Sequence, residues 1–350
     1  MVVQVSRMTP AAEVVRLEDP ASGLDGVIVI HSTVRGPGAG GCRFWPYPDL
    51  AAASTDAFRL AEGMSYKNAM AGLPFGGAKA VLRRPAGDFD REALFRAFGR
   101  AVADLGGSYV TAEDVGTSVA DMHSVAAETR HVAGLAAEGG RAGGDPSPWT
   151  AQGVFDAMEA GAAHAFGSSL RGLTVAVQGT GNVGAELCRR LADAGADLVI
   201  ADVNPERRDR LEKILGARVV DVADIHRVEA DIFAPCALGG ALTPESVAAM
   251  KAKLVCGGAN NQLASPEVAD LMLARGIAYV PDYVANAGGI ISVSAEYLGE
   301  NRAHVVARVA QIGPRVAALL EEAARDRRSP ALVADRLAER LISGVDRIAA

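Results

Sequence analysis

Two lysines in glycine-rich, apolar surroundings are the residues of this sequence best suited to chemistry. Lysine is scarce in the 350-residue chain, because only five of its 35 basic residues are Lys and the other 30 are Arg. Lys67 lies within Met64–Met70, and Lys79 ends the run Pro74–Lys79. A lysine amine can lose its proton, whereas an arginine guanidinium cannot. Both lysines are therefore predicted to serve catalysis, with ordinary solvated lysines as the alternative.

A glycine turn further along the chain predicts a dinucleotide site. The apolar run Leu173–Gln178 leads into the turn 179–184, and Ala185–Ala192 has helical spacing. In such strand–turn–helix units the glycines permit a tight turn, approach of a pyrophosphate, and close packing of helix on strand. The next apolar run, Ala196–Ala201, ends where the acid that binds the adenosine ribose is expected. The predicted cofactor-binding residues here are Gly179, Thr180, Gly181, Asn182, Val183, Gly184 and Asp202.

The carboxylate of Asp202 predicts NAD rather than NADP as the cofactor. It would accept hydrogen bonds from the ribose hydroxyls and repel a 2′-phosphate. Arg207 and Arg208 follow closely and weaken this preference. The alternative for the whole motif is a structural turn that binds nothing.

Composition and charge favour a two-domain enzyme and exclude several partners. The chain exceeds the size at which one core usually stops growing. Its formal charge of −7 and the lack of a basic stripe argue against nucleic acid. No secretory signal or membrane-spanning apolar run is visible, so a cytoplasmic location is expected. Four widely spaced cysteines predict reduced thiols and no metal site: Cys42, Cys188, Cys236 and Cys256.

The pattern of apolar residues predicts an α/β fold in two domains with the active site in a cleft between them. Strands are expected at residues 27–34, 78–84, 109–112, 230–234, 254–256 and 277–280, and helices at 50–70, 91–105 and 149–166, with helical spacing again in the tail from residue 301. The stretch Glu138–Pro148 is rich in glycine and proline and predicts the linker. The predicted domains are an α/β substrate and catalytic domain at 1–147, a Rossmann-type doubly wound parallel sheet at 148–325, and a C-terminal helix at 326–350 that packs back toward the first domain.

Polar loops after the predicted strands supply further candidates, because ligands of open α/β sheets bind beyond the carboxyl ends of the strands. Asn260 and Asn261 follow one strand and would bind the nicotinamide ribose or, alternatively, cap the next helix. Asp114 closes a strand of the first domain, where it would be a functional carboxylate or only form an Asx turn.

Taken together, these motifs resemble the amino acid dehydrogenase family of glutamate, leucine, valine and phenylalanine dehydrogenases. The resemblance covers nearly the whole chain and rests on segments in family order: 36–43, 64–70, 74–79, 111–117, 179–184, 258–262 and 286–289. It implies that Lys67 binds the substrate carboxylate, that Lys79 is the catalytic lysine, and that Asp114 handles the protons of the amino group. Gly40 and Gly41 would offer backbone groups to the substrate. Further implied contacts are Cys236, Ala237, Ala259, Asn260 and Asn261 for the cofactor, and Asn261 also for the substrate.

The reaction implied by the resemblance is the reversible, NAD-dependent oxidative deamination of an L-amino acid to a 2-oxo acid and ammonia, by an enzyme expected to be a homo-oligomer. In the leucine-type members a leucine stands where this chain has Ala39. Ala112, Ile290 and Val293 would complete an uncharged pocket, which disfavours glutamate. The enlarged pocket predicts phenylalanine as the substrate, with leucine or valine as the alternative and alanine richness as the trivial explanation of Ala39.

Two other classes stay open at this point. Shikimate-type dehydrogenases also place a Lys and an Asp ahead of a Rossmann domain, but they act on a hydroxyl and need one lysine. A regulatory protein that senses NAD would bind the cofactor without turnover, which the presence of Lys67, Lys79 and Asp114 disfavours.

Overall fold

The structure is a computed structural model that describes residues 4–8, 12–135 and 142–344, and the chain divides into two compact units. The first unit comprises Met1–Gly144, Ser292–Val305 and Leu337–Ala350, and the second comprises Asp145–Ile291 and Val306–Arg336. The main division falls inside the predicted linker, of which residues 138–141 lie outside the described residues.

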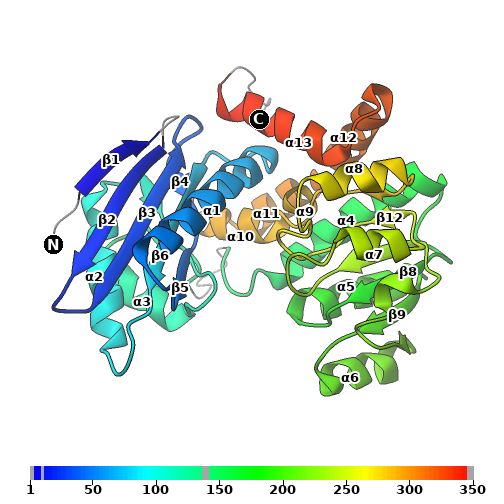
Figure 1. The fold of residues 1–350 in the computed structure, drawn as a ribbon, viewed down its shortest axis with the longest axis horizontal. Coiled ribbons are helices and arrows are strands. Elements are labelled where there is room, and N and C mark those ends of the chain that lie inside the picture. The colour runs from blue at the N-terminus through cyan, green and yellow to red at the C-terminus, as the bar shows by residue number, and fades with distance from the viewer. Residues whose placement is uncertain (1–3, 9–11, 136–141, 345–350) are drawn as a thin grey trace. The chain divides into compact units, whose positions relative to one another are not determined.

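A seven-stranded mixed sheet forms the centre of the first unit (Figure 1). Its path runs β1-β2-β3-β6-β4-β7, and β5 also pairs with β6. The pairs β1–β2, β2–β3 and β3–β6 are antiparallel, whereas β4 and β5 run parallel to β6. The strands are β1 (Gln4–Met8), β2 (Ala12–Asp19), β3 (Leu24–Ser32), β4 (Gly38–Ala39), β5 (Cys42–Trp45), β6 (Gly76–Arg83) and β7 (Tyr109–Val110). The strands predicted near β3, β6 and β7 are confirmed, whereas β1, β2, β4 and β5 were not predicted.

Helices cover both faces of this sheet. The small side chains of Ala53, Ala57 and Ala61 in α1 (Leu50–Met70) are spaced by four residues and pack on Val27, Val29 and Val81. The opposite face packs its alternate residues, including Ile28 and Leu82, against α2 (Arg91–Asp104) and α3 (Val119–Ala126). The helices predicted over residues 50–70 and 91–105 are therefore confirmed.

The second unit is built on a parallel sheet whose order is β10-β9-β8-β11-β12-β13. Numbered from β8, this is the order 3-2-1-4-5-6 of a dinucleotide-binding doubly wound fold, and the predicted fold class is confirmed. The strands are β8 (Thr174–Gln178), β9 (Asp197–Ala201), β10 (Arg218–Val219), β11 (Ile232–Pro235), β12 (Leu254–Val255) and β13 (Ala278–Tyr279).

Helices also cover both faces of the second sheet. One face packs Val199, Phe233 and Val255 against the 3₁₀ turn η1 and helices α7 and α8. On the other side α4 packs against α5 and α12. The helices of this unit are α4 (Ser147–Phe166), α5 (Asn182–Asp193), α6 (Pro205–Leu215), η1 (Ile225–Arg227), α7 (Pro244–Ala249), α8 (Glu267–Ala274), α9 (Asp282–Ala285) and α12 (Ile312–Asp326).

Three helices contribute to both units: α10 (Gly288–Tyr297), α11 (Arg302–Val309) and α13 (Pro330–Ile342). The sequence placed residues 292–305 in the NAD-binding domain, but their contacts group them with the first unit. Tyr297 explains this, because its hydroxyl lies 2.9 Å from Nδ1 of His131 and its ring contacts Phe75. Residues 337–344 also group with the first unit, and Tyr66 donates a hydrogen bond to Glu339 over 3.2 Å.

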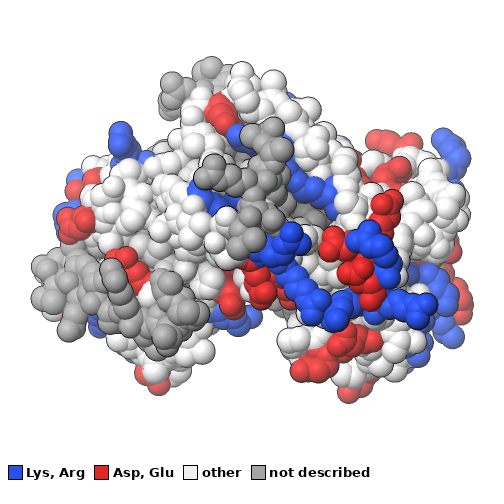
Figure 2. All heavy atoms as spheres, turned by 90° about the horizontal axis from the view of Figure 1, so that it is seen from above, with Lys and Arg blue, Asp and Glu red and all other residues white. Residues whose placement is uncertain are grey.

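The hydropathy of the helices and the mixed charge of the surface agree with the composition of the chain. Among the described residues, no helix combines the length and the hydropathy needed to cross a membrane. On the face drawn in Figure 2, acidic and basic side chains lie beside one another. The cysteines are free thiols, as predicted, and Cys42, Cys188 and Cys256 are buried.

Candidate active site

Lys79 is a buried amine on the face of the first sheet that α1 covers. Side chains alternate along β6, so Lys79 projects from the same face as Val81, which packs on α1. Only 5% of Lys79 is exposed. Its Nζ lies 3.0 Å from Oδ2 of Asp114, and this ion pair is the partner that a buried charge requires. The structure thus brings together the two residues predicted to be catalytic.

Asp114 lies beyond the end of β7 and is held by two cations. Besides Lys79, Nε of Arg43 donates to Oδ2 over 3.0 Å. Burial alone would raise the pKa of Asp114, but the charges and hydrogen bonds of Lys79 and Arg43 hold it below its ordinary value. The alternative of an Asx turn is wrong, because the carboxylate of Asp114 contacts Arg43 and Lys79 and accepts from no backbone N–H of a described residue.

Arg43 connects this pair to a second carboxylate, and its role was not predicted. Its Nη1 donates to Oδ2 of Asp56 over 2.9 Å. Asp56 also accepts a short hydrogen bond from the hydroxyl of Tyr47, and it forms an ion pair with Arg59 at 2.9 Å. Burial, followed by the hydrogen bond to Asp56, raises the pKa of Tyr47 to about 12. The sequence contained one signal, because Arg43 ends the motif 36–43.

The predicted substrate glycines lie where two backbone segments meet. A Cβ on Gly40 would lie 1.8 Å from the carbonyl oxygen of Ala78, and one on Gly41 would lie 2.5 Å from that of Glu113. Close packing therefore requires both glycines, whether or not they bind a substrate. The N–H of Gly40 donates to Val110 and its carbonyl accepts from the hydroxyl of Tyr109, so its backbone groups already have partners.

The remaining substrate candidates are divided between the units. Lys67 is half-buried in the last turn of α1, and Ala39 is buried in β4. Ala112 and Val293 are half-buried and belong to the first unit, whereas the half-buried Ile290 belongs to the second.

The turn 179–184 has the geometry of a phosphate-binding turn. Gly179 has φ +96°, which favours glycine, and a Cβ on Gly184 would lie 2.0 Å from the carbonyl oxygen of Gly179. A Cβ on Gly181, in contrast, would meet nothing closer than Nη1 of Arg207 at 3.9 Å. The Gly181 backbone is thus open to a ligand. Asn182 and Val183 begin α5, whose N-terminal N–H groups favour an anion.

Asp202 stands where the ribose acid was predicted, but its oxygens also hold the turn together. Oδ2 accepts from the N–H of Thr180 over 2.5 Å and from Oγ1 of Thr180 over 2.9 Å. Oδ1 accepts from the N–H of Asn204 over 2.8 Å. Burial would raise the pKa of Asp202, but these bonds and the charge of Arg207 hold it below its ordinary value. A carboxylate has about four acceptor sites, so capacity for a ribose hydroxyl remains.

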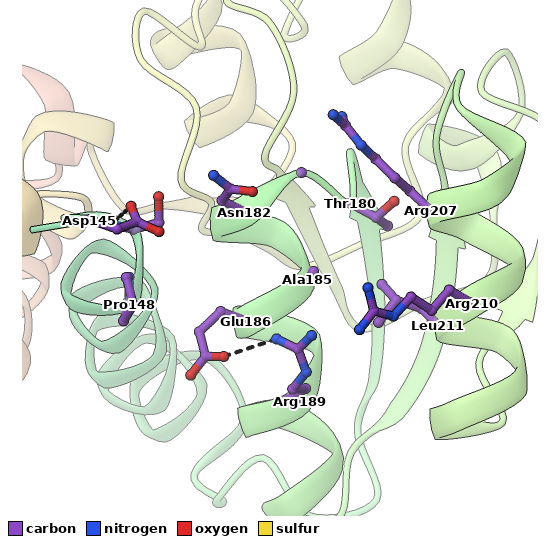
Figure 3. A pocket seen from close by; sticks show the side chains of 12 residues that line it. Asp145, Pro148, Thr180, Asn182, Ala185, Glu186, Arg189, Arg207, Arg210 and Leu211 are labelled. Carbon is purple, nitrogen blue, oxygen red and sulfur yellow. Dashed lines mark hydrogen bonds and ion pairs between the residues drawn. The ribbon is translucent and has the colours of Figure 1, made fainter. Parts of the chain in front are cut away.

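A pocket of the second unit opens beside this turn (Figure 3). Its lining combines the turn residues Thr180 and Gly181 with arginines of α5 and α6: Arg189, Arg207 and Arg210. Arg189 pairs with Glu186 over 3.0 Å. Arg207 and Arg210 are exposed and form no side-chain hydrogen bond or ion pair with any described residue. Positive charge is therefore available next to Asp202.

The other cofactor candidates gather around the same turn. A Cβ on Gly179 would lie 2.8 Å from the backbone nitrogen of Ala237, and one on Gly258 would lie 2.8 Å from the side chain of Val183. Cys236 begins the loop after β11, and its Sγ accepts from the N–H of Gly258 over 3.3 Å. The predicted residues at the ends of three strands are thus brought together.

The loop after β12 carries the two asparagines. Asn260 accepts a hydrogen bond over 2.9 Å from the buried amide of Asn286, and Ala259 donates its N–H to Pro235 over 2.9 Å. Asn261 has φ +52°, an uncommon conformation for a residue other than glycine, which is found at constrained functional loops. The alternative that the asparagines cap a helix is wrong, because α8 begins only at Glu267.

The second unit has a doubly wound sheet with an open glycine turn, and the first unit holds a buried lysine–aspartate pair. This combination indicates the class of nucleotide-dependent dehydrogenases. Two family models match the chain. The Glu/Leu/Phe/Val dehydrogenase dimerisation domain matches residues 11–131, and the glutamate/leucine/phenylalanine/valine dehydrogenase model matches residues 200–334.

Individual relatives match nearly the whole chain. Leucine dehydrogenase of Geobacillus stearothermophilus is 47% identical over 94% of this chain and 90% of its own length. Valine dehydrogenase of Streptomyces virginiae is 49% identical over 95% and 93%. The crystal structure of L-tryptophan dehydrogenase from Nostoc punctiforme has a TM-score of 0.85 and 37% identity over 96% of both chains.

The chain belongs to the glutamate/leucine/phenylalanine/valine dehydrogenase family, and it is an amino acid dehydrogenase. Members of this family depend on pyridine nucleotides. The family assignment confirms the resemblance seen in the sequence and excludes the shikimate-type alternative.

Two glycine substitutions should separate the packing role from the binding role of the turn. Gly184→Ala places a Cβ against backbone and should lower the melting temperature, because overpacking costs about 1 to 3 kcal/mol. Gly181→Ala has space in the protein and should leave the melting temperature unchanged, while weakening NADH binding about tenfold or more, measured by fluorescence titration. Unchanged NADH affinity in Gly181→Ala would show that this turn does not hold the pyrophosphate.

Proposed function

We propose that the protein oxidises a branched aliphatic L-amino acid, leucine or valine, to the 2-oxo acid and ammonia with NAD as the oxidant. The observation that carries the proposal is that relatives named for these two substrates align along more than nine-tenths of the chain. Phenylalanine was the substrate predicted from the sequence, but that prediction rested on Ala39 alone. The names of the relatives support the leucine and valine alternative better.

The chemistry assigns a task to each buried charge. In the proposed reaction, amino acid, water and NAD⁺ become 2-oxo acid, ammonium, NADH and a proton, and bound NAD would supply the acceptor for the hydride of Cα. The positive charge of Lys67 suits the substrate carboxylate. Lys79 would take a proton from the water that attacks the carbon–nitrogen double bond. Asp114 would exchange protons with the departing amine, and its separation of 3.0 Å from Lys79 allows a proton to pass between them.

Substitution of the two lysines should affect different kinetic constants. Lys79→Ala should lower kcat about 100-fold or more, because a general acid–base group acts only in the chemical step. Lys67→Ala should mainly raise KM for the amino acid. Lys213→Ala, which alters an exposed lysine of α6, is the matched control and should change neither constant. A loss of less than about tenfold in Lys79→Ala would exclude it as the general base.

The substrate proposal is tested by initial rates with NAD over a panel of L-amino acids. Leucine and valine should have the highest kcat/KM and glutamate the lowest, because none of the four residues predicted from the sequence to meet the substrate side chain is charged: Ala39, Ala112, Ile290 and Val293. An aromatic substrate is the second candidate, favoured by the small Ala39 and by the match to a tryptophan dehydrogenase. If phenylalanine ranks first, Ala39→Leu should move the preference to leucine by about 10-fold to 200-fold.

The proposal of NAD rests on Asp202, whose negative charge disfavours the 2′-phosphate of NADP, whereas the positive charge of the exposed Arg207 favours it. Asp202→Asn keeps an acceptor for Thr180 but removes the charge, so the ratio of kcat/KM for NAD over NADP should fall about tenfold. Arg207→Ala in the same background should restore the ratio by weakening NADP use. Equal use of both coenzymes by the unaltered enzyme would contradict this assignment.

We also propose that the enzyme is a homo-oligomer. The support is the match of residues 11–131 to a domain described by its dimerisation. The mass in solution, measured by light scattering, tests this directly.

A further inference from the structure

We propose that Arg43 is a positioning residue that keeps Asp114 ionised during the part of the catalytic cycle in which Lys79 is neutral. This inference rests on the proposed function, because it concerns the proton transfers of deamination. It assigns a role to an arginine that contacts Asp114 and to which the proposed function gives no other task.

The first support is the way in which the two cations share Asp114. Nζ of Lys79 and Nε of Arg43 both approach Oδ2 at 3.0 Å. No hydrogen bond from a described residue ends on Oδ1, and the Asp114 side chain stays 23% exposed. One oxygen is therefore fixed by the protein, and the other is available to an amino group.

The second support is the difference between the two cations. A general base must be unprotonated before it can accept a proton, and in that neutral state Lys79 no longer compensates the carboxylate. Burial would then draw a proton onto Asp114, which could no longer accept one from the substrate amine. A guanidinium keeps its charge throughout the accessible pH range. Arg43 therefore supplies the constant positive charge that Lys79 cannot.

The third support is that Arg43 is fixed from both sides. Its strand β5 pairs with β6 so that Arg43 lies opposite Val81, two residues from Lys79. Its outer nitrogen is anchored by Asp56, which Tyr47 and Arg59 hold in turn. The Arg43 side chain is only 20% exposed. This anchoring holds the guanidinium in place when the charge of Lys79 changes.

Other groups near Asp114 do not replace Arg43. Burial raises the pKa of Cys42 in β5 and of Tyr109 in β7 well above their ordinary values, so both stay neutral at working pH. Asp56 and Arg59 of α1 reach Asp114 only through Arg43. Glu113 adjoins Asp114 in the chain, and burial raises its pKa. Glu113 is therefore a second group that could produce an acid limb in a pH profile.

The test is the pH profile of kcat/KM for the preferred amino acid. In Arg43→Gln the burial of Asp114 is opposed by Lys79 alone, so the pKa of Asp114 rises and the acid limb should move to higher pH by about one unit or more. Arg43→Lys keeps a positive charge, so its acid limb should lie close to that of the unaltered enzyme. Arg59→Gln removes the other arginine on Asp56 without touching Asp114 and is the matched control, with an unchanged profile. Glu113→Gln identifies any contribution of the neighbouring carboxyl.

The outcomes separate this inference from the proposed function. If the unaltered enzyme turns over no amino acid, the proposed function fails first. If it is active and folded Arg43→Gln keeps the original acid limb, Arg43 has only a structural role. If Arg43→Gln does not fold, Arg43→Lys decides: near-normal activity with an unmoved acid limb supports the inference. A folded Arg43→Lys as inactive as Asp114→Asn contradicts it, because the charge is retained.

Discussion

The ion pair between Lys79 and Asp114 is the constraint around which the first unit is arranged. An amine that is 5% exposed must have a partner, and breaking a buried pair typically costs about 3 to 5 kcal/mol. The pair requires two backbone segments to approach closely. Gly40 and Gly41 permit this approach, because a Cβ on either residue would strike backbone of β6 or of the loop that carries Asp114. The helix α1, with its small buried alanines, then covers the face on which Lys79 lies.

In the second unit, the glycine turn depends in a similar way on one set of hydrogen bonds. To bind a pyrophosphate as proposed, this turn must leave backbone N–H groups open and yet remain fixed without the ligand. Asp202 fixes it, since its carboxylate accepts three hydrogen bonds from Thr180 and Asn204. The same charge faces the exposed Arg207. If Asp202 selects the coenzyme as proposed, one side chain serves both coenzyme preference and the rigidity of the turn, and a substitution that changes one will affect the other.

Much of the fold could be predicted because it follows from the local spacing of apolar residues. The helical pattern of residues 50–70 predicted α1, and the order of apolar runs indicated the doubly wound sheet. The missed elements lack such patterns: β2 buries its residues without strict alternation, and β4 has two residues and exists because β6 and β7 flank it. The grouping of residues 292–305 with the first unit depends on contacts such as Tyr297 with His131, which no local pattern reveals.

The candidate site was predictable to the extent that its residue types were unusual. Lys79 and Asp114 could be selected because lysine is scarce and because a carboxylate closed a strand. Arg43 was missed, since it is one arginine among 30 and its place at the end of the motif 36–43 does not reveal its contact with Asp114. The substrate was the weakest inference, because one small residue, Ala39, cannot separate an aromatic ring from a branched chain. Coenzyme choice was also incomplete, since spacing located Asp202 but not its bonds to Thr180.

The two cations at Oδ2 of Asp114 show why a lysine and an arginine are not interchangeable in this site. Two cations approach this atom at the same distance of 3.0 Å, and one is a lysine and the other an arginine. If only attraction mattered, either residue would serve at both places. A general base must be able to exist without its proton, which a lysine can do and an arginine cannot, whereas a counter-charge only has to stay positive. An arginine in the place of Lys79 would preserve the net charge and could not act as the proposed base, so the proposed chemistry depends on a lysine at that position.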